Sequence, residues 1–333
     1  MNIHQLDIAI FGGGIAGLWT LARLRQAGYR VALFERRAIG GVQSIASQGI
    51  IHGGTKYALT GKLTGSATAI GAMPGIWRAA LAGTGEVDLR GVQVLAAHQH
   101  LWSTGSLASG VAGFFAGKVM QSRMQTLHRD EFPAPFDTPA FSGSLYRLEE
   151  PVLDPRSLAA AFLDQYGDSC HWLQAAPRFE RMAAGWQVEL PSGDSLEARA
   201  LVLAAGGGNA GLLDLLGHDA PKMQVRPLHM LMLRGRLPLV HAHCLGASAN
   251  PRLTITSYPA DDGRVVWYLG GQVAEEGVAR GPAEQIAAGR AELAELLPWL
   301  DLRDLQWATL RVDRAEAATP GGKRPDDAYV GER

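Results

Sequence analysis

Residues 6–37 read LDIAIFGGGIAGLWTLARLRQAGYRVALFERR, and this stretch decides the fold. The apolar run from Leu6 to Phe11 predicts a short buried strand. Ile15 to Ala27 has apolar residues at helical spacing, and Val31 to Phe34 predicts a second strand that Glu35 closes. The order strand, glycine turn, helix, strand and acid is typical of a dinucleotide-binding βαβ unit.

The turn between the first strand and the helix carries the spacing GxGxxG at Gly12, Gly14 and Gly17. In such a unit the first glycine permits a tight turn, the second lets a pyrophosphate approach the backbone, and the third lets the helix pack on the sheet. The helix begins with Ile15 and Ala16, whose N–H groups and positive dipole end favour phosphate.

The second strand ends at an acid, which is where a dinucleotide-binding unit contacts the adenosine ribose. Glu35 would accept hydrogen bonds from the ribose hydroxyls, and we count Arg36 among the cofactor contacts. Arg36 and Arg37 could bind a 2′-phosphate instead, although two arginines after a strand are more often solvated. The segment therefore predicts a dinucleotide site without naming the dinucleotide.

The segments that follow favour FAD over NAD. After Glu35 comes a loop rich in Gly and Ser, RAIGGVQSIASQGIIHGGTKYAL (37–59), where an NAD domain would usually continue with a helix and a strand. Far along the chain, residues 171–200 suggest a β-meander. Residues 201–204 then form a strand that runs into AAGGG and a helix. This discontinuous pattern is typical of a flavoprotein.

At these residues the chain resembles the glycine oxidase/D-amino acid oxidase-like (DAO) family of FAD-dependent oxidoreductases. The resemblance covers most of the chain and rests on the first βαβ unit and on four further segments: QSIASQGIIHGGTKYAL (43–59), VLDPRSLAAAF (152–162), LVLAAGGGN (201–209) and RAEAATPGGKRPDDAYVG (314–331). It implies an α/β fold with a Rossmann-like FAD-binding domain and an interrupting, mainly antiparallel-sheet substrate domain.

The resemblance also implies a division of the chain. We expect residues 1–60, 149–221 and 311–333 to form the FAD-binding domain, and residues 61–148 and 222–310 to form the substrate domain. In the family another glycine-rich turn and a helix follow the last segment and close over the flavin. This sequence ends at Arg333, so we expect either a fragment or a more open flavin end.

The loop at 43–59 supplies most of the expected flavin contacts. His52 and Lys56 would lie at the isoalloxazine ring, where a cation or polar group favours the anionic reduced flavin or polarises the substrate or oxygen. The alternative is a loop histidine and a solvated lysine. The remaining expected cofactor contacts in this part of the fold are Gln43, Ser44, Ser47, Gln48 and Gly49, together with Ala205 and Gly206 after the returning strand.

An arginine and two tyrosines are expected near the substrate. The resemblance places a substrate-facing arginine at Arg314, and arginine binds a carboxylate bidentately. Arg226 and Arg311 compete for this role, and a surface ion pair of Arg314 with Glu316 or Asp313 is the alternative. Tyr258 would line the pocket by strand alternation, as would Tyr268, whereas Trp267 favours core packing.

Two HxH pairs, His98/His100 and His241/His243, lack further ligands at short range, so we expect no metal. With 333 residues, 47% hydrophobic residues and a net charge of −1, the chain favours about two globular domains and no nucleic-acid partner. Two cysteines, no signal peptide and no apolar run of ~18 residues predict a cytoplasmic protein without a transmembrane segment.

The expected activity is oxidation of the C–N bond of an amino acid or related amine by hydride transfer to FAD, with oxygen or another compound as electron acceptor. The first alternative is a dehydrogenase of 2-hydroxy acids or of the glycerol-3-phosphate type, because IIHGGTKY is similar to that branch too. The second alternative is a flavin-binding protein without turnover.

Overall fold

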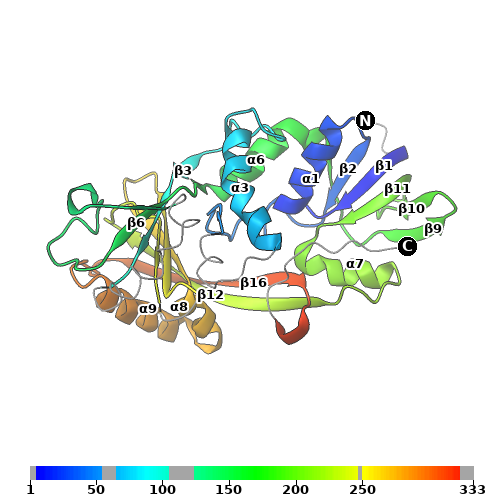
Figure 1. Ribbon diagram of the computed structural model, residues 1–333. Coiled ribbons are helices and arrows are strands. Elements are labelled where there is room, and N and C mark those ends of the chain that lie inside the picture. The colour runs from blue at the N-terminus through cyan, green and yellow to red at the C-terminus, as the bar shows by residue number, and fades with distance from the viewer. Residues whose placement is uncertain (1–4, 55–64, 105–123, 247–249, 323–333) are drawn as a thin grey trace.

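The computed structural model describes residues 5–54, 65–104, 124–246 and 250–322. Two β-sheets lie at opposite ends of an elongated molecule, and a helix lies between them (Figure 1). The fold is mixed α/β, as the sequence predicts.

The first sheet contains the predicted βαβ unit and six strands. β1 pairs in parallel with both β2 and β11, and β2 pairs in parallel with β8. The meander then adds two antiparallel strands. In spatial order the strands are β8 (Cys170–Trp172), β2 (Val31–Glu35), β1 (Gln5–Phe11), β11 (Ser195–Leu203), β10 (Gly185–Glu189) and β9 (Arg178–Met182). The predicted strands and meander are confirmed.

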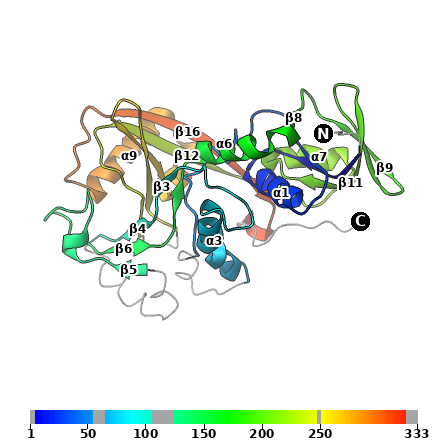
Figure 2. The ribbon, with the colours of Figure 1, turned by 90° about the horizontal axis from the view of Figure 1, so that it is seen from above.

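Helices cover both faces of this sheet (Figures 1 and 2). On one face, α1 (Ile15–Gln26) and α6 (Pro155–Tyr166) bury Leu18, Leu21 and Phe162 in one core cluster. The side chain of Asp154 caps α6 by accepting from the N–H groups of Arg156 and Ser157. On the other face, α7 (Asn209–Leu215) contributes Leu212 to a second cluster.

The second sheet has eight strands and is antiparallel except where β13 runs parallel to β4. The strands predicted within residues 222–275 are confirmed as four of its members. In spatial order the strands are β16 (Gln306–Ala317), β12 (Met223–Gly235), β15 (Val265–Gly270), β14 (Leu253–Pro259), β13 (Ala242–Cys244), β4 (Gln99–Trp102), β6 (Leu145–Leu148) and β5 (Met124–Thr126).

The two faces of the second sheet have different partners. One face packs against α9 (Pro282–Leu296), and Trp102, Trp267 and Leu293 belong to its core. The other face carries Met230 and Tyr268, which contact the loop that follows β2. A short helix α8 (Gln272–Glu276) follows β15, and a two-stranded sheet joins β3 (Val94–Ala96) to β7 (Val152–Leu153).

Two elements cross the expected domain boundaries, and the division itself stays a prediction. The α3 helix (Gly65–Leu81) was assigned to the substrate domain, yet Ala80 and the neighbouring Leu89 share a core cluster with α1. The expected boundary at 310/311 falls inside β16, which pairs with β12 along its whole length. The β12–β16 ribbon thus runs from the second sheet towards α7 (Figure 1). Within the described residues, no helix combines the length and apolarity needed to cross a membrane.

Candidate cofactor and substrate site

The glycine turn after β1 is held by close backbone packing at two of its three glycines. Gly12 has φ +116°, and a Cβ there would overlap the backbone of Ala204 at the end of β11. A Cβ on Gly17 would overlap the carbonyl oxygen of Gly12. These two positions need glycine for the turn and for helix packing, as the spacing predicts.

Gly14 differs, because nothing in the described chain requires glycine there. Its φ of −75° suits any residue, and an added Cβ would meet only the Ser44 hydroxyl oxygen, at 3.2 Å. The turn therefore leaves an open cradle beside the N-terminus of α1. A pyrophosphate fits this cradle, because the first-turn N–H groups and the positive dipole end of the helix lie beside it.

Two predicted cofactor residues border this cradle. The Glu35 carboxylate accepts from the backbone N–H groups of Gly13 at 2.6 Å, Arg36 at 2.8 Å and Arg37 at 2.7 Å. The Ser44 hydroxyl accepts from the N–H of Ile15 at 2.9 Å and so caps α1. The carboxylate is thus fixed beside the glycine turn, where the ribose role was predicted.

The exposed first-turn residue Ala16 lies on α1 at this same end, and the Arg36 side chain is exposed. The Arg36 contact with Glu35 is made by its backbone. Direct contact of either residue with a cofactor stays a prediction.

The loop after β2 crosses the second sheet strand by strand, which the sequence did not reveal. Over β15, the Tyr268 hydroxyl donates to the carbonyl of Ala46 at 3.0 Å. The Gln48 amide donates to the carbonyl of Tyr268 at 2.9 Å and to the Thr256 hydroxyl at 3.3 Å. Over β13, the ring of His52 stacks on that of His243. One face of this loop is therefore already occupied by the sheet.

The returning strand, the loop and β16 meet at Gln43. Its side-chain oxygen accepts from the N–H of Ala315 at 3.1 Å, and a Cβ on Gly206 would lie 3.7 Å from the same oxygen. The N–H of Ala205 donates to the Asn209 side chain at 2.8 Å. Gln43, Ala205 and Gly206, predicted separately, are thus brought together.

The remaining predicted loop residues have contacts within the protein. Gly49 has φ +68°, and its carbonyl accepts a backbone hydrogen bond from the N–H of Leu153 in β7 at 2.9 Å. A Cβ on Gly49 would overlap the carbonyl of Leu153. The exposed Ser47 hydroxyl accepts from the N–H of Gly49 at 3.4 Å. The Gln48 amide donates to the sheet. Cofactor contacts of Ser47, Gln48 and Gly49 stay predictions.

A buried acid that the sequence did not single out holds His52. Glu150 is 4% exposed, and its Oε2 lies 3.6 Å from His52 Nδ1, while its Oε1 accepts from the N–H of Gly53 at 2.6 Å. The Gln99 amide also donates to Oε2. Burial opposes the charged form, but the hydrogen bonds from His52 and Gly53 and the charges of His52 and His243 outweigh it. The pKa of Glu150 is therefore lowered. Lys56 lies outside the described residues.

The predicted substrate residues lie on the second sheet. Arg314 Nε donates to the carbonyl of Arg226 at 3.1 Å, and its Nη2 lies 3.8 Å from Glu275. Arg314 therefore forms an ion pair with Glu275, whereas Glu316, one of the two partners expected for it, pairs with Arg226. Arg311 binds the backbone carbonyls of residues 278 and 280.

Tyr258 packs beside Tyr268, and burial raises the pKa of Tyr258 to about 12. It can donate a hydrogen bond but does not ionise near neutral pH. Its role in catalysis, like that of Arg314, stays a prediction.

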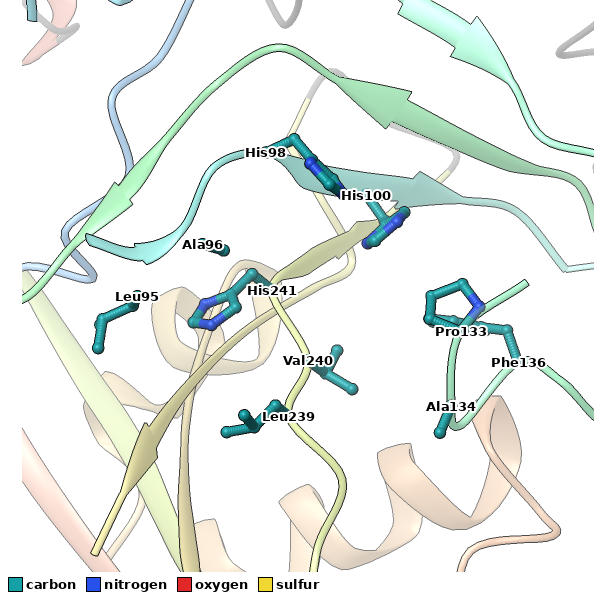
Figure 3. A pocket seen from close by; sticks show the side chains of 10 residues that line it. All are labelled: Leu95, Ala96, His98, His100, Pro133, Ala134, Phe136, Leu239, Val240 and His241. Carbon is teal, nitrogen blue, oxygen red and sulfur yellow. The ribbon is translucent and has the colours of Figure 1, made fainter. Parts of the chain in front are cut away.

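Three of the four HxH histidines line a separate cavity of about 200 Å³ (Figure 3). Burial, with smaller contributions from neighbouring groups, lowers the pKa values of His100 and His241 to about 4, so both are neutral at physiological pH. Among the described residues, no three His, Cys, Asp or Glu side chains are arranged to hold a metal ion.

Comparison with known proteins agrees with this geometry. A family model described as FAD dependent oxidoreductase (DAO) matches residues 7–331. The probable FAD-dependent oxidoreductase PA4991 of Pseudomonas aeruginosa is 50% identical over 331 residues, which are 98% of this chain and 84% of that protein. The crystal structure of PA4991 superposes with a TM-score of 0.83 at 44% identity, covering 100% of this chain and 84% of that one.

More distant solved structures share the fold. Glycine oxidase from Geobacillus kaustophilus has a TM-score of 0.64 at 18% identity, covering 96% of this chain and 87% of its own. An L-amino acid deaminase from Proteus vulgaris has a TM-score of 0.64 at 16% identity, covering 94% and 79%.

Proposed function

The chain belongs to the DAO family of FAD-dependent oxidoreductases, and from this premise we propose that it oxidises the C–N bond of an amino acid or related amine. FAD, when bound, supplies the hydride acceptor. The observation that carries the placement of this cofactor is the open cradle at Gly14, between the N-terminus of α1 and the fixed Glu35 carboxylate. In this cradle the Gly14 backbone would hold the pyrophosphate, Glu35 the adenosine ribose and Ser44 a phosphate or ribityl oxygen.

The face of the second sheet that meets the loop supports the amine substrate. It carries Tyr258 and Tyr268, and the β12–β16 ribbon presents Arg314 next to Arg226 in register. An arginine here would bind the carboxylate of an amino acid, in competition with Glu275. Two proteins of the same fold, the glycine oxidase and the L-amino acid deaminase, are named for action on amino acids.

A panel of substrates tests this proposal. The FAD-loaded protein is mixed without oxygen with glycine, sarcosine, D- and L-amino acids, 2-hydroxy acids and glycerol 3-phosphate, and loss of the visible flavin absorption is followed. Reduction by an amino acid or amine, and not by its hydroxy analogue, is expected. Reduction by the hydroxy compounds alone would establish the dehydrogenase alternative, and a flavin that no compound reduces would contradict the proposal.

Re-oxidation of the reduced protein in air then tests the electron acceptor. A rapid return of the flavin absorption with hydrogen peroxide release is expected for an oxidase. A reduced flavin that persists in air would indicate another acceptor.

A further inference from the structure

We infer that Glu150 is a positioning residue for His52, fixing the proton of its imidazole on Nδ1 so that Nε2 accepts the proton that the substrate releases. This inference rests on the proposed function for the identity of the proton donor. The tautomer itself is a property of the chain and can be measured without any substrate.

The contacts of Glu150 show how firmly this corner of the loop is held. One carboxylate contacts two successive residues: its Oε2 lies 3.6 Å from Nδ1 of His52, and its Oε1 accepts from the N–H of Gly53. The side chain of Gln99, which is fully buried on β4, also donates to Oε2. A contact with the side chain of His52 and a hydrogen bond to the adjacent backbone restrain the ring far more than a single contact would.

A second histidine restrains the face of the ring. The His243 ring lies 5.7 Å from that of His52, centroid to centroid, at an interplanar angle of 23°. His243 is itself 8% exposed, and its Nδ1 lies 2.8 Å from the Thr254 hydroxyl oxygen. The ring of His52 is thus clamped on an edge and a face, although its side chain is 43% exposed. A solvated loop histidine needs no such support.

The charge of the partner decides the tautomer. A carboxylate held in its ionised form only accepts hydrogen bonds, so the imidazole nitrogen that faces it must carry the proton. Nδ1 of His52 faces Glu150, which leaves the lone pair on Nε2, on the edge of the ring that points away from the acid. The same carboxylate stabilises the imidazolium that forms when Nε2 gains a proton.

The proton and electron balance follows directly. A substrate ammonium loses one N–H proton to Nε2 of His52. FAD, when bound, would accept the hydrogen of the adjacent C–H bond together with both bonding electrons, which would leave the substrate as an iminium. Two electrons and two hydrogens leave the substrate in total, one hydrogen as a proton and one as a hydride.

Nitrogen-15 NMR of protein labelled in histidine tests the inference at a fixed mildly alkaline pH. The His52 signals are assigned by their loss in the H52N variant. The wild-type protein should show a protonated Nδ1 and an unprotonated Nε2. In E150Q the new amide can donate to Nδ1, so the proton should move to Nε2. A wild-type His52 with its proton on Nε2, or an unchanged pattern in E150Q, would overturn the inference.

The matched control is E149Q, because the neighbouring Glu149 is an exposed acid whose carboxylate pairs with Arg147 at the surface. This variant should leave the His52 signals and the flavin content unchanged. Any loss of fold in E150Q would leave the wild-type spectrum as a sufficient test.

Kinetics provide the second readout once a reducing substrate is known. E150Q should lower kcat/KM by about 10²-fold, mainly through kcat, within the range of general base catalysis. E150D, which keeps the charge, should restore part of this loss. If no substrate reduces the flavin while the tautomer is as stated, the proposed function fails and the positioning role stands. If the flavin is reduced equally fast in E150Q, the positioning role fails and the proposed function stands.

Discussion

At the scale of single residues, the three glycines of the first turn are glycine for different reasons. Gly12 and Gly17 avoid overlap with the protein's own backbone, whereas a Cβ on Gly14 would meet only the Ser44 side chain. The cost of a side chain at Gly14 should therefore fall on the cofactor and leave the fold intact.

The first prediction is that Gly14→Val yields a folded protein with at least a tenfold loss in FAD affinity, or about 1.4 kcal/mol. The valine side chain would stand where the pyrophosphate approaches the helix N-terminus. Flavin content and a thermal melt measure the two effects separately. The control is Gly91→Val, where an added Cβ meets nothing within 4 Å, and it should keep its flavin. Equal flavin content in both variants would contradict the cradle.

At the scale of elements, the loop of residues 36–54 is held by contacts with a sheet that begins far away in the sequence. The Gln48 amide bonds three oxygens on β14 and β15, including the Thr254 carbonyl at 3.4 Å. Losing these donors leaves buried oxygens without their partner, which is costly.

The second prediction is that Gln48→Leu lowers the free energy of unfolding by about 1–3 kcal/mol. Because the same loop carries Ser44 and His52, flavin affinity should fall as well. Urea denaturation and flavin titration measure both effects. Gln187→Leu, on the meander strand β10, is the control and should change stability by about 0.5 kcal/mol or less. If Gln48→Leu changes the free energy of unfolding no more than this control does, the loop does not depend on the hydrogen bonds of Gln48.

The third prediction concerns the cavity lined by His98, His100 and His241. His100 and His241 have pKa values near 4 in the folded protein, below the unfolded value of 6.5. Between these two pH values the unfolded chain binds protons that the folded protein does not bind. The contribution of these histidines to the free energy of unfolding should therefore be fully present above pH 6.5 and be lost as the pH drops towards 4. Each imidazole can add at most about 1.4 kcal/mol per pH unit to the slope of the free energy of unfolding against pH.

The measurement is urea unfolding between pH 7.5 and 5, a window above the titration of the carboxylates. His241→Asn should flatten the slope, whereas the control His218→Asn, at an exposed position, should not. A slope that stays the same in His241→Asn would contradict a neutral, buried His241.

At the scale of the whole molecule, the loop after β2 and the β12–β16 ribbon both bridge the two sheets beside the site. The loop after β2 leaves the first sheet and docks on the second, and the β12–β16 ribbon returns towards the turn at Gly206. A cofactor held at Gly14, as proposed, would lie where both segments converge.

The fourth prediction is that FAD at 100 times its Kd raises the free energy of unfolding by about 2.7 kcal/mol, since a ligand that binds only the folded state stabilises it by mass action. Urea unfolding of the apoprotein with and without added FAD measures the increment. At the same FAD concentration Gly14→Val, which binds FAD at least tenfold more weakly, should keep no more than about 1.4 kcal/mol of this increment. The same increment in both proteins would mean that FAD binds elsewhere.

The sequence alone predicted the βαβ unit, the FAD cofactor, the fold class and the strands of the second sheet. The βαβ unit and the strands follow from residues close together in the chain: apolar runs, glycine spacing and the acid at the end of β2. The cofactor and the fold class followed from the order of such segments along the chain and from the family they resemble. Local periodicity reports which face of an element is buried, and turn glycines report where the backbone must bend or approach something closely.

Only the tertiary structure showed that Glu150 lies beside His52 and that Gln48 binds the loop to the second sheet. Gly53 and Glu150 are 97 residues apart, and Gln48 and Tyr268 are 220 residues apart. In the sequence Glu150 is one of two acids before a proline, with nothing that separates a buried carboxylate from a solvated one. Its burial and charge arise only when β4, β13 and the loop meet around it. Contacts between distant segments leave no local pattern, so the partner of His52 could be assigned only from the folded chain.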